Sequence, residues 1–283
     1  MRIIIFLSTV LLMFSACKKS GSGNDSPPAA VALTLTDVAY SSDAKQKMDI
    51  YLPAGRSADS TKLLFLIHGG GWTEGDKADF TAAVDGLRTR FPNYAFVNVN
   101  YRLAVNGQNL FPTQENDIKA ATALVFNKRN EYLVSDKWAF LGASAGGHLA
   151  LLQAYKYSSP VKPKAVISFF GPSELTALYN TNLLAAFALA GVTGGTPATH
   201  AAIYQQSSPY TFITAQSPPT MLLHGGADPL VPPSQSTIVR DKLQLLGVPQ
   251  QYVFYPDAGH GWDGTNLLDS FDKIAVFLQT YMN

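Results

Sequence analysis

The sequence predicts an α/β fold, with a mostly parallel central sheet of about eight strands, helices on both faces and a small cap. Continuous apolar runs of four to six residues recur along the chain and are typical of strands buried on both faces of a sheet. Helix-like stretches alternate with them, and Gly or Pro marks the loops between. The length of 283 residues suits one large domain of this class.

Each element can be placed from its pattern. Segments 33–40 and 47–52 alternate apolar and polar residues and predict two antiparallel edge strands. Buried strands are predicted at 63–67, 95–99, 138–141, 165–170, 220–223 and 252–255, and helices at 78–90, 114–130, 148–157, 234–246 and 267–282. The interval 173–218 is longer than a simple crossover and contains an apolar helical run, so we expect a cap over the site. Surface helices remote from any ligand are the alternative.

Charge balance and motif content exclude several classes of function. The chain has 21 Lys and Arg against 20 Asp and Glu, so no net charge would recruit nucleic acid. It contains no CxxC, no HExxH and no Gly-rich phosphate loop, so neither a metal nor another cofactor is indicated. The only cysteine, Cys17, has no partner for a disulfide.

A nucleophile elbow is predicted around Ser144. An apolar strand runs into Gly-Ala-Ser-Ala-Gly and then into a helix-forming stretch. A serine at such a turn has strained backbone geometry, and Gly142 and Gly146 allow the strand and the helix to approach each other. The Ala145 amide would lie in the first helical turn, where unpaired N–H groups favour developing negative charge. Ala145 is therefore a predicted oxyanion donor.

Candidates for a base and an acid lie in loops that follow two later strands. One loop delivers Asp228 and the next delivers His260. His260 would take the proton from Ser144 and later protonate the leaving group, while Asp228 would hold the imidazole in the required tautomer. Asp257 and Asp263 flank His260, but Asp228 is preferred because the acid must approach the imidazole from a different loop.

The other histidines are not expected to act as the base. His68 is expected to organise its loop, His148 to be structural, and His224 to lie on the wrong side of the chain order, while nothing assigns His200 a role.

A second oxyanion element follows the apolar strand 63–67. Here His68 is followed by three glycines and Trp72, and glycine amides can point into a site without side chains in the way. Gly70 and Gly71 are the predicted donors, and losing one such donor typically costs about 3–4 kcal/mol of transition-state stabilisation.

Taken together, these motifs resemble the α/β-hydrolase superfamily, in the esterase and lipase branch with an HGGG-type oxyanion loop. The chain is similar to bacterial carbohydrate-ester esterases of the acetyl-xylan and feruloyl type. The resemblance covers about residue 33 to the C-terminus and is carried by MDIYLP at 48–53, HGGGW at 68–72, NYRL at 100–103, GASAGG at 142–147 and HGGADPLVP at 224–232. The superfamily orders its triad as Ser, Asp or Glu, then His, which this chain matches. The hormone-sensitive-lipase-like branch usually has Asp before the nucleophile, whereas this chain has Ala143.

The resemblance implies a serine carboxylic-ester hydrolase that works through an acyl-enzyme and removes acetyl or feruloyl groups from carbohydrate. An amidase of the kynurenine-formamidase-like branch is one alternative, and a non-catalytic envelope binding protein is another. The oligomeric state does not follow from the sequence.

Two tryptophans, Trp72 and Trp262, stand beside the predicted catalytic loops. We expect them to contact the substrate by stacking on a sugar or an aromatic acyl group, with core packing as the alternative. A pocket walled by two indoles would be short and flat, so acetyl and propionyl esters are expected to be favoured over octanoyl and longer ones.

The N-terminus predicts export and lipid attachment. Residues 1–17 combine Arg2, an apolar run of about a dozen residues and small residues before Cys17. They resemble a bacterial lipoprotein signal peptide, in which Cys17 is lipidated; an ordinary secretory signal is the alternative. Residues 18–30 read as a flexible tether, and 31–283 as the catalytic domain. The expected location is the bacterial cell envelope, on a membrane that faces the periplasm or the exterior.

Overall fold

The computed structural model describes residues 29–283. The predicted signal peptide, Cys17 and residues 18–28 of the predicted tether lie outside the described residues. Within the described part, an eight-stranded sheet has the order β1-β2-β4-β3-β5-β6-β7-β8. Its strands are β1 (Leu33–Ala39), β2 (Lys47–Leu52), β3 (Leu63–Ile67), β4 (Ala95–Val99), β5 (Trp138–Ala143), β6 (Ala165–Phe169), β7 (Thr220–Gly225) and β8 (Gln250–Tyr255). Strands β3 to β8 run parallel, and β1 and β2 are antiparallel additions.

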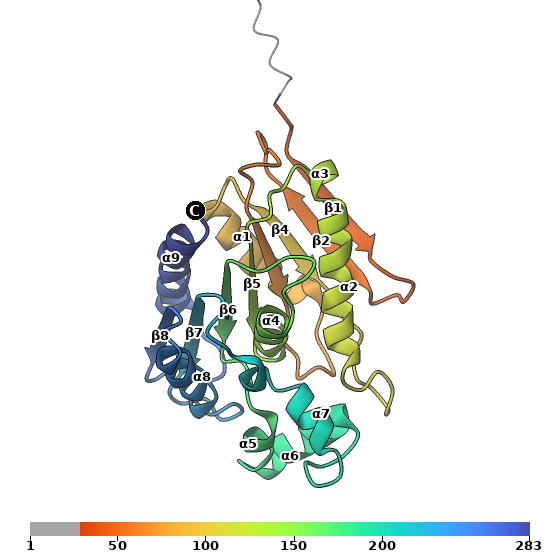
Figure 1. Ribbon diagram of the computed structural model, residues 1–283, viewed down its shortest axis with the longest axis vertical. Coiled ribbons are helices and arrows are strands. Elements are labelled where there is room, and N and C mark those ends of the chain that lie inside the picture. The colour runs from red at the N-terminus through yellow and green to blue at the C-terminus, as the bar shows by residue number, and fades with distance from the viewer. Residues whose placement is uncertain (1–28) are drawn as a thin grey trace, which may run out of the picture.

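Two layers of helices cover the sheet (Figure 1). The helices of the described part are η1 (Lys77–Phe80), α1 (Thr81–Arg90), α2 (Thr113–Asn127), α3 (Arg129–Tyr132), α4 (Ala145–Lys156), α5 (Leu175–Tyr179), α6 (Leu183–Thr193), α7 (Ala201–Gln206), η2 (Pro209–Phe212), α8 (Ser234–Leu245) and α9 (Gly264–Tyr281). Helices α2, α4 and α8 contribute to one apolar core and α1 and α9 to the other. Strand β3 serves both, because Phe65 and Ile67 enter the first core and Leu64 and Leu66 the second. This is why its sequence is continuously apolar.

The main differences from the sequence prediction concern element ends and one strand position. Strand β2 is not an edge strand, because it pairs with both β1 and β4. Helix α4 begins at Ala145 rather than at residue 148, because the elbow passes directly from the strand into the helix. The prediction started too late because the two glycines after Ala145 are weak helix formers. The predicted helix 114–130 divides into α2 and α3, with Lys128 between them.

The interval 173–218 contains α5, α6, α7 and η2. Figure 1 shows these helices gathered at one end of the molecule, opposite the end at which the described chain begins. Their position is at the carboxyl ends of the parallel strands, where open α/β sheets bind ligands. No helix within residues 29–283 combines the length and hydropathy that a membrane span requires.

Candidate active site

Ser144 occupies a strained turn between β5 and α4. Its φ of 54° and ψ of −123° are unusual for a residue with a side chain, and such geometry costs about 1–3 kcal/mol. A Cβ atom on Gly142 would collide with the Gly146 carbonyl, and one on Gly146 would collide with the Ile67 carbonyl at the end of β3. The two glycines therefore allow β5, α4 and β3 to meet directly beneath the serine.

Ser144, His260 and Asp228 form one hydrogen-bonded chain, although they come from three separate loops. His260 Nε2 lies 2.8 Å from Ser144 Oγ, and His260 Nδ1 lies 2.8 Å from Asp228 Oδ2. Since the buried carboxylate accepts a hydrogen bond, Nδ1 carries the ring proton and Nε2 presents its lone pair to the serine hydroxyl. This is the arrangement in which an imidazole can remove the hydroxyl proton.

Four neighbours hold the Asp228 carboxylate in its charged form. Its side chain is completely buried, and burial raises its pKa. The carboxylate accepts hydrogen bonds from the rings of His224 and His260 and from the amides of Val231 and Leu230. Together these outweigh the effect of burial, so the pKa of Asp228 lies well below its usual range. Asp228 therefore stays ionised next to the imidazole at neutral pH. Asp257 and Asp263 make no hydrogen bond to His260 within the described residues.

Residues of both predicted oxyanion elements line the same pocket as Ser144. Gly70, Gly71 and Ala145 all border it. Gly70 has a φ of +103°, and a Cβ atom there would collide with the Glu74 carbonyl, so only glycine fits this bend. The loop is braced from behind by Tyr101, whose hydroxyl donates to the carbonyls of His68 and Gly69.

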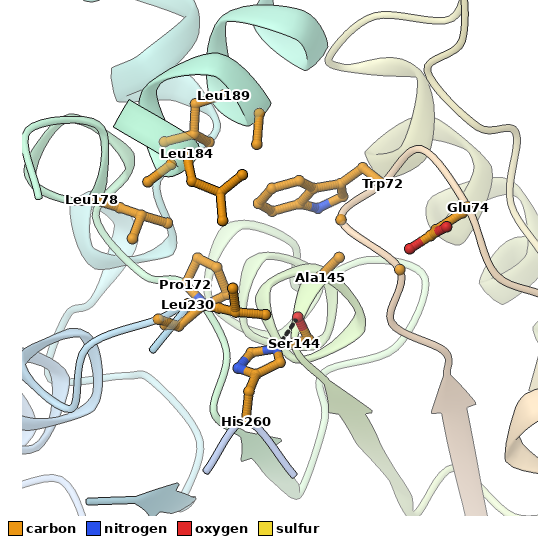
Figure 2. Close-up of a pocket in the computed structure, with 15 residues that line it drawn as sticks. Trp72, Glu74, Ser144, Ala145, Pro172, Leu178, Leu184, Leu189, Leu230 and His260 are labelled. Atoms are coloured by element: carbon orange, nitrogen blue, oxygen red, sulfur yellow. Dashed lines mark hydrogen bonds between the residues drawn. The ribbon is translucent and has the colours of Figure 1, made fainter. Parts of the chain in front are cut away.

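The pocket above Ser144 has a volume of about 500 Å³ and is mainly apolar. Figure 2 shows Ser144 and His260 on one side, with Trp72, Pro172 and the leucines of the cap facing them. Polar side chains are few, namely Ser144, His260 and Glu74. Five residues of α5 and α6 complete the wall: Leu178, Leu184, Ala185, Ala188 and Leu189. The interval 173–218 thus contributes to the site as well as lying above it. Sequence patterns indicated that α6 is apolar, but not which of its residues face the serine.

Trp262 does not lie in this pocket, contrary to the expectation that two indoles wall it. Its ring packs against Phe169, Phe170 and Tyr255, and its Nε1 donates to Ser270 Oγ at 2.9 Å. The side chain therefore belongs to the core behind the His260 loop, and the prediction that Trp262 walls the pocket is wrong. Proximity in sequence to a catalytic loop does not determine on which side of that loop an indole packs.

Trp72 does border the pocket, and a buried histidine holds it there. Its Nε1 donates to His148 Nδ1 at 3.3 Å, and the Nε2–H of His148 donates to the Ser207 carbonyl at 2.6 Å. A second proton on Nδ1 would face the indole N–H. Burial lowers the pKa of His148 to about 4, which the Ser207 carbonyl only partly offsets, and the charge of Lys156 lowers it further.

This low pKa predicts a loss of stability in mild acid. The unfolded chain protonates the imidazole of His148 near pH 6.5 and the folded protein only near pH 4, so between these values the unfolded state binds more protons. The contribution of His148 is complete above pH 6.5 and is lost as the pH falls from 6.5 to 4, by about 3 kcal/mol in total. Urea titrations at about pH 7 and about pH 4.5 measure the loss.

A matched pair of variants isolates this effect. His148→Gln should be less stable near neutral pH but should lose less stability on acidification. His200→Gln changes a half-buried histidine outside the Trp72 contact and should keep the full acid loss. Equal acid losses in both variants would contradict the role of His148.

Two further residues support the site without having been predicted to do so. Phe170 has a φ of +41°, and its ring centroid lies 4.6 Å from that of His260. His224 is fully buried, interacts with Ser236 and Val231, and places its Nε2 3.4 Å from Asp228 Oδ2. No sequence signal distinguishes Phe170 from other strand-end aromatics. His224 is visible in the sequence, but only the fold shows that it braces Asp228.

Comparison with known proteins places this arrangement in a family. The BD-FAE family model matches residues 48–243, a segment that runs from β2 into α8 and includes both Ser144 and Asp228. The chain belongs to the BD-FAE family. The probable carboxylic ester hydrolase LipM of Mycobacterium tuberculosis is 30% identical over 215 residues, which cover 71% of this BD-FAE chain and 49% of LipM. Esterase LipC of the same organism is 25% identical, with 85% of this chain and 64% of LipC covered. The chain thus spans about half to two thirds of the length of these relatives.

Solved structures give the same fold. A bifunctional GH43-CE protein of Bacteroides eggerthii superposes with a TM-score of 0.74 at 28% identity, over 86% of this BD-FAE chain and 38% of that protein. The propionate-bound esterase Est2 of Thermogutta terrifontis superposes with a TM-score of 0.71 at 22% identity, covering 89% and 94%. The fold is therefore that of the α/β-hydrolases, as the resemblance in sequence implied. Within residues 29–283, no group of three His, Cys, Asp or Glu side chains could hold a metal ion.

Proposed function

We propose that this protein is a serine esterase that transfers the acyl group of a carboxylic ester to Ser144 and then to water. The observation that carries the proposal is the unbroken chain from Ser144 through His260 to the buried, ionised Asp228. Its BD-FAE membership and the esterase names of its relatives support the same reaction class. LipM and LipC are longer than this chain, so activity must be tested on the chain itself.

The geometry supports a two-step reaction. His260 takes the hydroxyl proton as Ser144 Oγ attacks the ester carbonyl, and the oxyanion that forms is placed toward the amides of Gly70, Gly71 and Ala145. The imidazolium returns the proton to the leaving alcohol, leaving an acyl-enzyme. Water then attacks this ester with His260 again as the base, and the acid is released. Asp228 stabilises the imidazolium in both steps.

The substrate is proposed to be an acylated carbohydrate that carries acetyl or feruloyl groups. A solved carbohydrate esterase from gut microbiota has the same fold, with a TM-score of 0.73, and supports this class. The apolar wall formed by Trp72 and the cap leucines suits an acyl group better than a sugar, because it offers few hydrogen-bonding partners. The carbohydrate part is therefore expected to lie toward the mouth of the pocket.

A direct substrate comparison tests both the reaction and its alternatives. Purified protein is assayed side by side on acetylated xylan, methyl ferulate, p-nitrophenyl acetate and N-formylkynurenine. We expect turnover of the esters and much slower turnover of the formamide. Preferred cleavage of N-formylkynurenine would favour the amidase alternative, and no turnover of any substrate would favour a binding protein.

The expected dependence of the rate on acyl length remains a prediction. Of the two tryptophans, only Trp72 now supports it. Acetyl and propionyl esters are expected to be favoured over octanoyl esters. Leu184 borders the pocket and its neighbour Leu183 does not, so they form a matched pair on α6. If long acyl chains extend beneath α6, Leu184→Trp should lower kcat/KM for p-nitrophenyl octanoate by about tenfold and barely affect the acetate. Leu183→Trp should change neither, and equal effects of the two variants would place the acyl chain elsewhere.

We also propose that the protein is a lipid-anchored envelope protein, on the basis of the sequence of residues 1–17. Radiolabelled palmitate should be incorporated into the wild-type chain in its bacterial host and not into Cys17→Ser. Several acyl chains on one cysteine would hold the protein firmly, whereas a single chain binds a membrane only marginally. A fully soluble, unlabelled wild-type protein would reject the anchor.

A further inference from the structure

Basic side chains collect at the end of the molecule opposite the pocket. Lys62, Lys137 and Lys164 each stand immediately before a parallel strand, β3, β5 and β6 respectively. These strands are neighbours, and the backbone pairs Leu63 with Lys137 and Lys164 with Trp138, so the three lysines form a row at the amino-terminal edge of the sheet. Adjacent strands lie about 4.8 Å apart, which keeps the row compact.

Two hollows lined by further cations flank this row. One, of about 550 Å³, is lined by Arg56 and Lys62, and the other, of about 280 Å³, by Arg129, Lys162 and Lys164. We call this region the basic end. Its seven cations are Arg56, Lys62, Lys128, Arg129, Lys137, Lys162 and Lys164, and its acidic side chains are Asp59, Glu131 and Asp136.

Most charges of the basic end have no acidic partner, although Lys62 Nζ donates to the side-chain carbonyl of Asn283 at 3.2 Å. Within residues 29–283, only Lys128 of the seven forms a salt bridge, with Glu131. In the rest of the described chain, eight of eleven Lys and Arg side chains do so, and there acidic residues outnumber basic ones by sixteen to eleven. Partial burial and the charge of Lys137 lower the pKa of Lys62, as expected where positive charges crowd. A nearby anion would relieve this repulsion.

The chain also joins the fold at the basic end. The Gly55 amide donates to the Ala30 carbonyl, and Arg56 donates to the Val31 carbonyl, at the rim of the larger hollow. Twelve residues separate Cys17 from Ala30. Even fully extended, they span only about 40 Å, so a lipid on Cys17 would keep the basic end near the bilayer surface.

We propose that the basic end binds the anionic phospholipid headgroups of the membrane in which Cys17 is anchored, and thereby turns the pocket away from that membrane. This orientation rests on the proposed lipidation. Ser144 follows β5 at its other end, about 20 Å from Lys137 for a strand of this length. A surface for an acidic polysaccharide substrate would be expected beside the pocket instead, so the headgroups are the better match. The pocket would face soluble or polymeric substrates.

The test is lysine footprinting of the acylated protein on vesicles. An amine-reactive, membrane-impermeant reagent is applied on phosphatidylcholine vesicles and on vesicles mixed with phosphatidylglycerol. Labelling of Lys62, Lys137, Lys162 and Lys164 should fall by roughly fivefold or more on the anionic vesicles and recover in high salt. Lys47, Lys119 and Lys242, which form no salt bridge within the described chain, should be labelled equally on both.

Two double variants that change the net charge equally distinguish binding by the basic end from a general effect of net charge. Lys162→Glu with Lys164→Glu should abolish the protection of Lys62 and Lys137, whereas Lys47→Glu with Lys119→Glu should leave it intact. Acylation is measured separately by palmitate incorporation. An acylated chain with equal labelling on both vesicles overturns this proposal and leaves the anchor standing. Protection of the same lysines by a soluble uronic-acid polysaccharide, but not by anionic vesicles, would overturn it in favour of a polymer site.

Discussion

Replacing Ser144 with alanine is expected to lower kcat on ester substrates by about five to six orders of magnitude. Within the described residues, the only hydrogen-bond partner of Ser144 Oγ is His260 Nε2, so the change removes the attacking atom and little else. The backbone bond from the Ser144 amide to the Phe169 carbonyl is retained. Steady-state kinetics on p-nitrophenyl acetate measures the loss, and retention of more than a small residual rate would remove Ser144 as the nucleophile.

Stability measurements on the same position show that the loss is chemical. Alanine keeps the Cβ atom and therefore keeps the strain of the positive φ, so the melting temperature of Ser144→Ala should remain close to that of the wild type. Ser144→Gly should also be inactive, but it relieves strain worth about 1–3 kcal/mol and should melt higher than Ser144→Ala. A variant that loses activity and cooperative unfolding together would not inform on catalysis.

The predictable part of this protein is the part governed by local rules. Both faces of β3 are buried, so its sequence is continuously apolar, and the glycines around Ser144 are required by backbone contacts that a Cβ atom would close. Once the strands are predicted, the loops at their carboxyl ends are located as well. Asp228 and His260 could therefore be paired with Ser144 from the sequence alone.

The part that sequence did not settle depends on packing between distant segments. Trp262 lies behind the His260 loop because Phe169 and Phe170 provide an apolar surface there, and no pattern around residue 262 indicates this. Likewise, His148 was expected to be structural, but its bond to Trp72 joins two segments 76 residues apart. Strand β2 was predicted to be an edge strand because its pattern alternates, but β1 lies outside it in the sheet.

Replacing Asp228 with asparagine is expected to lower kcat by about 10⁴-fold with little change in KM. Asp228 Oδ1 accepts hydrogen bonds from the amides of Leu230 and Val231, both at 2.9 Å. An asparagine would therefore place its carbonyl oxygen there and turn its NH₂ group toward His260. That group must donate to Nδ1, which moves the ring proton to Nε2. The imidazole would then face Ser144 with an N–H and could not accept the serine proton.

The same change in nearby carboxylates provides the matched controls for this assignment. Asp257→Asn and Asp263→Asn alter residues on the His260 loop and at the start of α9, and each should stay within a few-fold of the wild-type rate. Because the defect of Asp228→Asn is one of tautomer rather than of folding, its unfolding should remain cooperative and its rate should rise at high pH, where hydroxide can replace the base. If either control variant is the more damaging, the acid that orients His260 is not Asp228, and the buried carboxylate serves only to hold the loop that follows β7.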